Sequence, residues 1–184
     1  MSLSAAKRSF AEQHAFNREV LERLEADPGL RNAIEKIETD RDGNPIMSPA
    51  PSRRHAWRAN RIARVLERLG PGGISVVEQS VSTLEGIKVP DVVWYSPQRA
   101  LDAEADPDEV LSRVAPDLCV EVLSPSNTKR DMEDKMLAYF EVGVQEVWVC
   151  GLGGEMSFYG PQGPLEASVI CSQFPKVVPA TLLP

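Results

Sequence analysis

Two carboxylates stand in hydrophobic segments of the chain, where a charge is costly to bury. Asp91 follows a proline in the run 89–94, and Glu121 lies in the run 118–123. Buried acids of this kind usually share a cation, a proton or a basic side chain. If their strands are neighbours, the two carboxylates would suit Mg²⁺ or Mn²⁺, which takes one or two protein carboxylates together with water and phosphate oxygens. The pattern therefore favours metal-assisted attack of water on a phosphodiester.

Such a site would be completed by a nearby lysine, which stabilises a developing oxyanion and orients the attacking water. Strand alternation over 117–123 predicts that Asp117, Cys119 and Glu121 share one face. Asp91 has a simpler alternative as a turn residue after proline. Glu121 has apolar neighbours on both sides, so no comparable alternative fits it, and Glu78 is a third candidate carboxylate.

The order of predicted elements indicates an α/β fold with a mixed central sheet and helices on both faces. Hydrophobic periodicity and turn residues predict helices over 4–25, 53–69 and from a cap within 124–128 to about 141. They predict strands over 74–82, 89–95, 117–123 and 146–150, and a hairpin formed by 155–159 and 167–171. The segment 96–114 is expected to be a loop with at most a helical turn. Met132, Met136 and Phe140 are expected to face the core from the last helix.

The chain has 184 residues, of which 42% are hydrophobic, and this suits a single domain with an N-terminal extension. We expect a helical extension over 1–28, which docks on the domain or forms a dimer contact, and a domain over 29–184. Three widely separated cysteines show no zinc-like spacing and are expected to be reduced. No stretch is long and apolar enough to cross a bilayer, so a cytoplasmic protein without membrane contact is expected.

The formal net charge of −7 argues against coating of nucleic acid by bulk electrostatics. Charge is nevertheless unevenly distributed, because 53–68 holds six arginines and one acid, whereas 102–109 holds five acids and no base. Arg54, Arg58 and Arg61 form one stripe of the predicted helix. This stripe could contact phosphates or could be an ordinary solvated helix face.

Several stretches resemble the PD-(D/E)XK nuclease superfamily and, within it, the bacterial Uma-type family of putative restriction endonucleases, formerly a domain of unknown function. The resemblance runs from about residue 35 to residue 149. It rests on Met-Ser-Pro at 47–49 followed by His55, on Gln79, on Pro-Asp at 90–91, on Glu-Val-Leu-Ser-Pro-Ser at 121–126 and on Gly-Val-Gln-Glu-Val-Trp at 143–148.

This resemblance implies a restriction-endonuclease-like α/β/α core and a metal site formed by Asp91 and Glu121. In the superfamily pattern a lysine follows the glutamate by two residues, but Leu123 occupies that position here. The family implies that Lys135, on the following helix, supplies the ammonium group instead. Asp131, four residues earlier, could alternatively pair with Lys135 at the surface. The family also often carries an aspartate where this chain has Gly151.

Further candidates surround these three. Ser124, Asp131 and Tyr139 are plausible supporting donors or acceptors, and His55 is expected to cap or pack, or to line the cleft. Ser126 is expected to cap the last helix.

The leading hypothesis is a Mg²⁺-dependent or Mn²⁺-dependent endonuclease that hydrolyses double-stranded DNA. Cutting two strands requires two active sites, so a homodimer is expected. The first alternative is a catalytically inactive binding or scaffold protein that keeps the nuclease fold, which the acidic charge and Leu123 favour. The second is an enzyme acting on a small phosphorylated substrate, which would not need the arginine helix.

Overall fold

The structure is a computed structural model that describes residues 8–31, 36–47, 50–106 and 111–179. Three parts of the sequence predictions lie outside these residues: residues 4–7, the Ser48–Pro49 pair and part of the acidic segment. The start predicted for the N-terminal helix was wrong, because Ser9 is the N-cap of a helix that begins at Phe10. In chain order the elements are α1 (Phe10–Ala26), α2 (Pro28–Arg31), β1 (Glu38–Thr39), β2 (Pro45–Ile46), α3 (Arg53–Leu69), β3 (Ile74–Val77), β4 (Val81–Thr83), β5 (Gly86–Lys88), β6 (Val92–Tyr95), α4 (Pro97–Glu104), β7 (Leu118–Val122), α5 (Lys129–Glu141), β8 (Glu146–Cys150), β9 (Met156–Gly160) and β10 (Gly163–Leu165).

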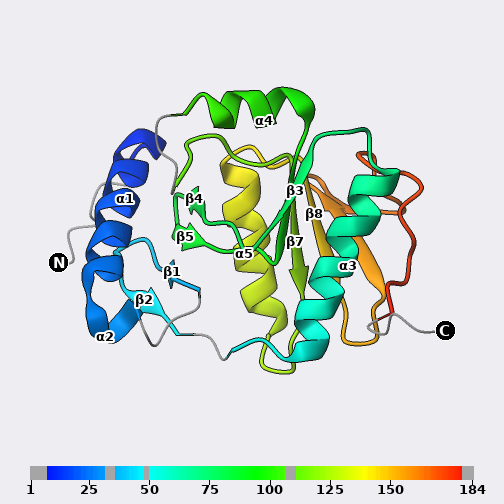
Figure 1. Ribbon diagram of the computed structural model, residues 1–184, viewed down its shortest axis with the longest axis horizontal. Helices are drawn as coiled ribbons and strands as arrows, with labels where there is room; N and C mark the ends of the chain where they lie inside the picture. Colours follow the sequence, from blue (N-terminus) through cyan, green and yellow to red (C-terminus); the bar gives the residue numbers. More distant parts are fainter. Residues whose placement is uncertain (1–7, 32–35, 48–49, 107–110, 180–184) are drawn as a thin grey trace.

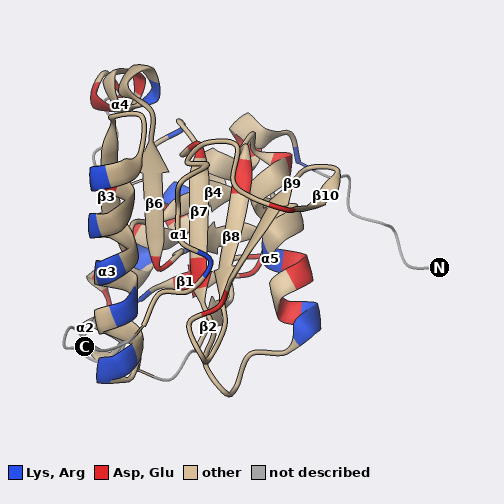
Figure 2. Ribbon diagram, turned by 90° about the vertical axis from the view of Figure 1, so that its right-hand side faces the viewer, with Lys and Arg blue, Asp and Glu red and all other residues tan. Residues whose placement is uncertain are grey.

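A six-stranded mixed sheet forms the centre of the molecule, in the order β10-β9-β8-β7-β6-β3. Among the strands of the described residues only β7 and β8 pair in parallel, and the chain joins them through the crossover helix α5. Helices α3 and α5 lie on opposite sides of this sheet (Figure 2). The α/β/α architecture expected from the sequence is therefore confirmed.

Helix α3 covers one face because its apolar residues recur at helical spacing. It begins at the cap Ser52, whose side chain accepts from the backbone N–H of His55, and ends before Gly70. Ile62 and Leu66 are fully buried in a cluster with alternate residues of β7, including Leu118 and Val120. The helix bounds agree with the sequence prediction.

Helix α5 covers the other face, where Cys119 of β7 packs. The expected alternation along β7 is therefore confirmed. Burial on α5 is rotated relative to the prediction, because Ala138 and Tyr139 are the most deeply buried residues of the helix. Of the three predicted core residues, Met132 is buried, whereas Met136 and Phe140 are only partly buried.

The register of the central strands brings the two predicted acids together. β6 pairs antiparallel with β7, and Val92 lies opposite Val120. Asp91 directly precedes Val92 and Glu121 directly follows Val120, so in this antiparallel pair the two acids lie at the next position. Asp91 and Glu121 therefore lie side by side on neighbouring strands, as the metal-site hypothesis requires.

Two short strand pairs, β1-β2 and β4-β5, lie between α1 and the main sheet (Figure 1). The β1 strand crosses close to β5, where Gly86 has φ 97° and a Cβ atom would lie 2.3 Å from the Asp40 carbonyl oxygen. Only glycine tolerates this conformation and this approach together. The contact holds β1 in place, and β1 carries a residue of the candidate site.

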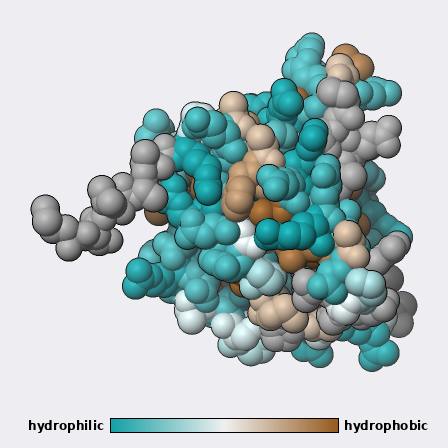
Figure 3. Space-filling model, turned by 90° about the vertical axis from the view of Figure 1, so that its left-hand side faces the viewer, coloured by the Kyte–Doolittle hydropathy of each residue, from teal (hydrophilic) through white to brown (hydrophobic). Residues whose placement is uncertain are grey.

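Helix α1 docks on this part of the domain. The buried side chain of Asn17 donates to Ser82 Oγ and to the Thr83 carbonyl oxygen, and Val20, Leu21 and Leu24 are also buried. The side of the molecule that carries α1 is mostly hydrophilic (Figure 3). Of the two roles considered for this helix, the structure shows docking.

Four other secondary-structure predictions were wrong. The segment 74–82 is not one strand, because Glu78 adopts φ 56° and separates β3 from β4. The hairpin partner of β9 is β10, not 167–171. The segment 96–114 contains the eight-residue helix α4, which Ser96 caps. Thr128, not Ser126, caps α5, and Asp131 completes that capping box.

Candidate active site

A cleft of about 780 Å³ opens at the end of β7. Its walls come from the segment before α3, the first turn of α3, the end of β7 and the turn that follows β7. Helix α5 contributes Lys135. Asp91 and Glu121 both line this cleft. The three residues predicted to carry the chemistry therefore share one cavity.

The Asp91 side chain is buried, with only 4% of its surface exposed. Three neighbours hold its carboxylate in place. The backbone N–H of Val122 donates to Oδ2 at 2.7 Å, and His55 Nε2 lies 3.2 Å from the same oxygen. Lys36 Nζ donates to Oδ1 at 2.6 Å. Charge-assisted contacts of this kind hold a carboxylate in its ionised form.

Glu121 faces α5, which supplies both of its partners. The Tyr139 hydroxyl donates to Oε1 at 2.6 Å, and Lys135 Nζ lies 3.2 Å and 3.3 Å from Oε1 and Oε2. Lys135 and Tyr139 are four residues apart and lie on one side of α5. Helix α5 thus presents an ammonium group and a hydroxyl to a single carboxylate.

Lys135 contacts acids of the site and not Asp131. Its Nζ atom also donates to Glu38 Oε1 at 2.9 Å, and its side chain is only 21% exposed. Asp131 instead accepts from the backbone N–H of Thr128 in the capping box. Lys135 therefore points into the site, and the predicted surface pair with Asp131 is not its main contact. Asp131 shapes the helix start and does not touch the two central acids.

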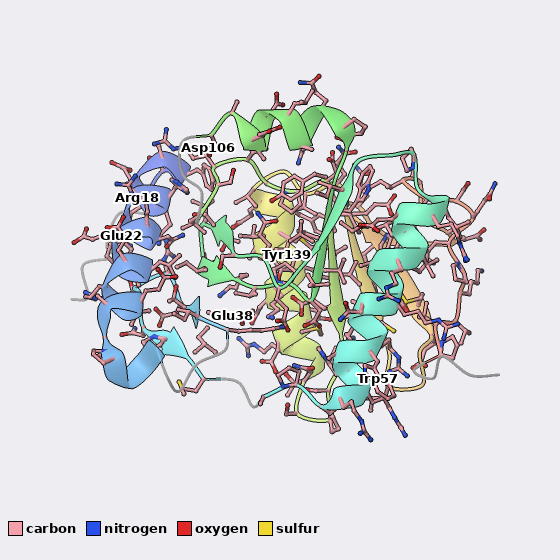
Figure 4. All side chains as sticks on the ribbon, in the orientation of Figure 1. Arg18, Glu22, Glu38, Trp57, Asp106 and Tyr139 are labelled. Atoms are coloured by element: carbon pink, nitrogen blue, oxygen red, sulfur yellow. The ribbon has the colours of Figure 1, made fainter. Side chains whose placement is uncertain are left out.

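Two residues of the site were missed by sequence reasoning. Glu38, at β1, is buried and accepts from Lys135 and from the backbone N–H of Val89. Figure 4 shows Glu38 on β1 and Tyr139 on α5. Lys36, two residues earlier, contacts Asp91. The only local signal is the alternation of Lys36 and Glu38 before the turn at 40–45, because β1 is too short to produce a strand pattern.

His55 and Glu78 lie close to Asp91 in different ways. His55 Nε2 lies 2.8 Å from the Val122 carbonyl oxygen and near Asp91 Oδ2, so both neighbours are acceptors and Nε2 carries the proton. Glu78 reaches the site through Lys36, at 3.4 Å. His55 therefore lines the cleft and also bridges Asp91 to the strand that bears Glu121.

The three arginines of the predicted stripe do not act as a set. Arg54 is exposed and lines the cleft, and Arg61 is partly exposed. Arg58 is 5% exposed, and its Nη1 donates to the carbonyl oxygens of Gly151 and Leu152. The Arg58 side chain is therefore not part of an exposed stripe, and it ties α3 to the loop after β8. Ser124 also lines the cleft, and its hydroxyl donates a hydrogen bond to Asn127 Oδ1.

The charges of the site shift the pKa values of its acids in opposite directions. Burial raises the pKa of Glu121, and the negative charges of Asp91 and Glu38 raise it further, against the opposing effects of Lys135 and Tyr139. Burial would also raise the pKa of Asp91, but His55 and Lys36 outweigh it and hold that pKa below the usual value. The pKa of Lys135 is lowered by burial and raised more strongly by Glu121 and Glu38. The raised pKa of Glu121 thus comes first from burial and only then from the neighbouring acids.

The donor set fits Mg²⁺ or Mn²⁺. Within the described residues, no three His, Cys, Asp or Glu side chains form a group that could hold a metal by themselves. Mg²⁺ does not need such a cage, because it retains several waters and is bound through one or two carboxylates and substrate phosphates. Asp91 and Glu121, which line one cleft, would be those carboxylates.

The His55 to Asp91 contact gives a testable pH dependence. The hydrogen bond and the charge of Asp91 raise the pKa of His55 above 6.5, against the effect of burial. Replacing Asp91 with asparagine removes the charge and leaves burial and Lys36, which both lower this pKa, together with the Val122 carbonyl oxygen, which raises it. We expect His55 to titrate above pH 6.5 in the wild type and at a lower pH in Asp91→Asn, as measured by NMR of the ring protons. His14→Gln identifies the signal, and an unchanged His55 titration would contradict the contact.

The chain is similar to known proteins over most of its length. A family model described as "Uma2: Putative restriction endonuclease" matches residues 18–164. The chain belongs to the Uma2 family. The match begins within α1 and ends within β10, so it includes every residue of the candidate site, and the resemblance inferred from the sequence is confirmed.

A solved structure shares the Uma2 chain's fold. It is described as a putative nuclease belonging to DUF820 from Anabaena variabilis, with a TM-score of 0.57 and 17% sequence identity, over 73% of this chain and 79% of that one. No curated protein matches the Uma2 chain in sequence. Among the residues that the structure describes, no helix has the length and apolar character that crossing a membrane requires.

Proposed function

We propose that the protein is a Mg²⁺-dependent endonuclease that hydrolyses DNA phosphodiester bonds at a PD-(D/E)XK-type site. One observation carries the proposal. Lys135, on α5, contacts both oxygens of Glu121, while Asp91 lies beside Glu121 across the β6-β7 pair. The ammonium group thus lies at the site even though Leu123 stands where the superfamily pattern has lysine.

Asp91 and Glu121 would hold the metal ion. When bound, Mg²⁺ supplies Lewis-acid stabilisation of phosphate oxygens and makes a coordinated water more acidic. The chain itself orients this pair: Val122 and His55 fix Asp91, and Tyr139 fixes Glu121. Rigid carboxylates of this kind lose little conformational freedom when the substrate binds.

Lys135 has two roles in this proposal. It fixes Glu121 through its contacts with both carboxylate oxygens, and it donates hydrogen bonds toward the negative charge that develops on the phosphate. Glu38 supports the ammonium group from the other side, at 2.9 Å. Because the pKa of Lys135 is raised, the lysine stays protonated and acts as a donor and not as a base.

Double-stranded DNA is the substrate that the surface favours. Basic residues lie along α3, next to the cleft (Figure 2). Arg54 lies in the cleft wall, and Arg61 lies on the same helix about two turns away. These side chains could contact backbone phosphates, which account for much of the affinity of proteins for DNA. A protein of net charge −7 can bind DNA in this way only through such a local patch.

We further propose a homodimer and a cytoplasmic location. A double-strand cut requires two active sites, which a two-fold dimer supplies. Three free and buried cysteines are compatible with a reducing compartment. Sedimentation of the purified protein tests the dimer.

The alternative is a nuclease-fold protein that binds without hydrolysis. A specific observation favours it: Lys36 and Lys135 already neutralise Asp91 and Glu121. The deciding experiment is incubation of supercoiled plasmid with the protein in Mg²⁺, in Mn²⁺ and in EDTA. Our proposal predicts nicked or linear DNA with either metal and none with EDTA, whereas binding without cleavage in all three would favour the alternative.

A further inference from the structure

Lys36 is a second cation at the site, and the proposed chemistry does not use it. Its Nζ atom lies 2.6 Å from Asp91 Oδ1 and 3.4 Å from Glu78 Oε1. The side chain is 17% exposed and lines the cleft, so its ammonium group stands between a buried acid and a half-exposed one. Lys36 thus has two carboxylate partners at unequal distances.

The shorter contact uses an oxygen that a metal ion would need. Asp91 Oδ2 already accepts from the Val122 backbone N–H and lies against His55. Oδ1 contacts only Lys36 among the described residues, so it is the oxygen more open to a metal ion. A divalent cation and an ammonium group on one carboxylate oxygen repel each other strongly in a weakly solvated site. Metal binding at Asp91 therefore favours movement of Lys36 away from this oxygen.

Glu78 is placed to receive the displaced ammonium group. It is the only residue other than glycine with positive φ within the described ranges, at 56°, and its backbone N–H donates to the Asp91 carbonyl oxygen at 3.3 Å. A conformation of this kind costs energy and persists where the surrounding structure requires it. The bend holds the Glu78 carboxylate, 48% exposed, on the solvent side of Lys36.

We propose that Lys36 is the resident counter-cation of Asp91, that a divalent metal must displace it in order to bind, and that Glu78 accepts the displaced ammonium group. The inference rests on the proposed metal site. It makes Lys36 a determinant of metal affinity, because the protein binds metal only to the extent that the lysine leaves Asp91.

Calorimetric titration of the DNA-free protein with Mn²⁺ tests the inference. Removing the competing charge in Lys36→Met is expected to tighten Mn²⁺ binding about tenfold. Lys36→Gln keeps a hydrogen-bond donor for Asp91 and is expected to show the same direction, which guards against a folding defect in the first variant. Lys36→Arg keeps the charge and should bind no more tightly than the wild type. Lys129→Met removes an exposed lysine, 91% exposed, and should leave the affinity unchanged.

Glu78→Gln tests the second half of the proposal. Without an acceptor for the displaced lysine, Mn²⁺ affinity is expected to fall about threefold, and this effect should vanish when Lys36 is already methionine. A loss that persists in the double variant would overturn the role of Glu78.

The outcomes separate this inference from the proposed function. Equal Mn²⁺ affinity in the wild type and in both neutral Lys36 variants would overturn the inference and leave the metal site intact. Absence of binding heat in all of them would overturn both. As a readout independent of calorimetry, Mn²⁺ should raise the unfolding temperature more in Lys36→Met than in the wild type.

Discussion

Replacing Lys135 with methionine is expected to reduce metal-dependent DNA cleavage by about a thousandfold. The ammonium group contacts both Glu121 oxygens and lies 2.9 Å from Glu38 Oε1. Methionine has a similar shape but cannot donate to the substrate or balance these acids. Single-turnover cleavage of a plasmid, compared with that by the wild type, measures the loss.

The same change is expected to lower the free energy of unfolding by about 2 kcal/mol, because two carboxylates then face each other without their shared cation. Lys129→Met, on the exposed side of the same helix, is the matched control and should alter neither quantity appreciably. Cleavage at the wild-type rate by a folded Lys135→Met protein would remove Lys135 from the mechanism.

Glu121→Gln is expected to abolish cleavage to a similar extent, about a thousandfold, but to change stability in the opposite direction. Glutamine keeps the shape of glutamate and still accepts from the Tyr139 hydroxyl. Lys135 keeps Glu38 as its partner. No isolated charge is left behind, in contrast to the lysine variant.

The sign follows from the raised pKa of Glu121, which burial causes first and the nearby acids increase. A carboxyl group whose pKa is higher in the folded protein contributes stability at low pH, and this contribution is lost as the pH rises through the folded-state pKa. The advantage of Glu121→Gln over the wild type should therefore grow as the pH is raised from 4 to 8, as measured by chemical unfolding. A variant less stable than the wild type at pH 8 would show that the ionised carboxylate is a net stabilising group.

Much of the fold could be predicted because its signals are local. The bounds of α3 follow from a cap, an apolar stripe and a glycine, and β7 and β8 follow from continuous apolar runs. Asp91 and Glu121 could be found because a charge within such a run needs an explanation. These inferences require only neighbouring residues.

The errors at the candidate site involve contacts between distant parts of the chain. Glu38 lies 97 residues before Lys135, on a two-residue strand that no periodicity marks. Arg58 lies on the same helical stripe as the exposed arginines. It is nevertheless buried, and it donates to carbonyl oxygens of a loop more than 90 residues away. The break at Glu78 depends on an αL conformation that a glutamate adopts only because the surrounding fold imposes it.

The most direct test of the central claim is plasmid cleavage by the wild type and by Asp91→Asn in Mn²⁺. Asparagine keeps the size of the side chain and removes the charge that would hold the metal. Asp102→Asn, an exposed change on α4, controls for the altered net charge. We expect metal-dependent cleavage by the wild type and by Asp102→Asn and none by Asp91→Asn. Cleavage by Asp91→Asn at the wild-type rate would contradict it.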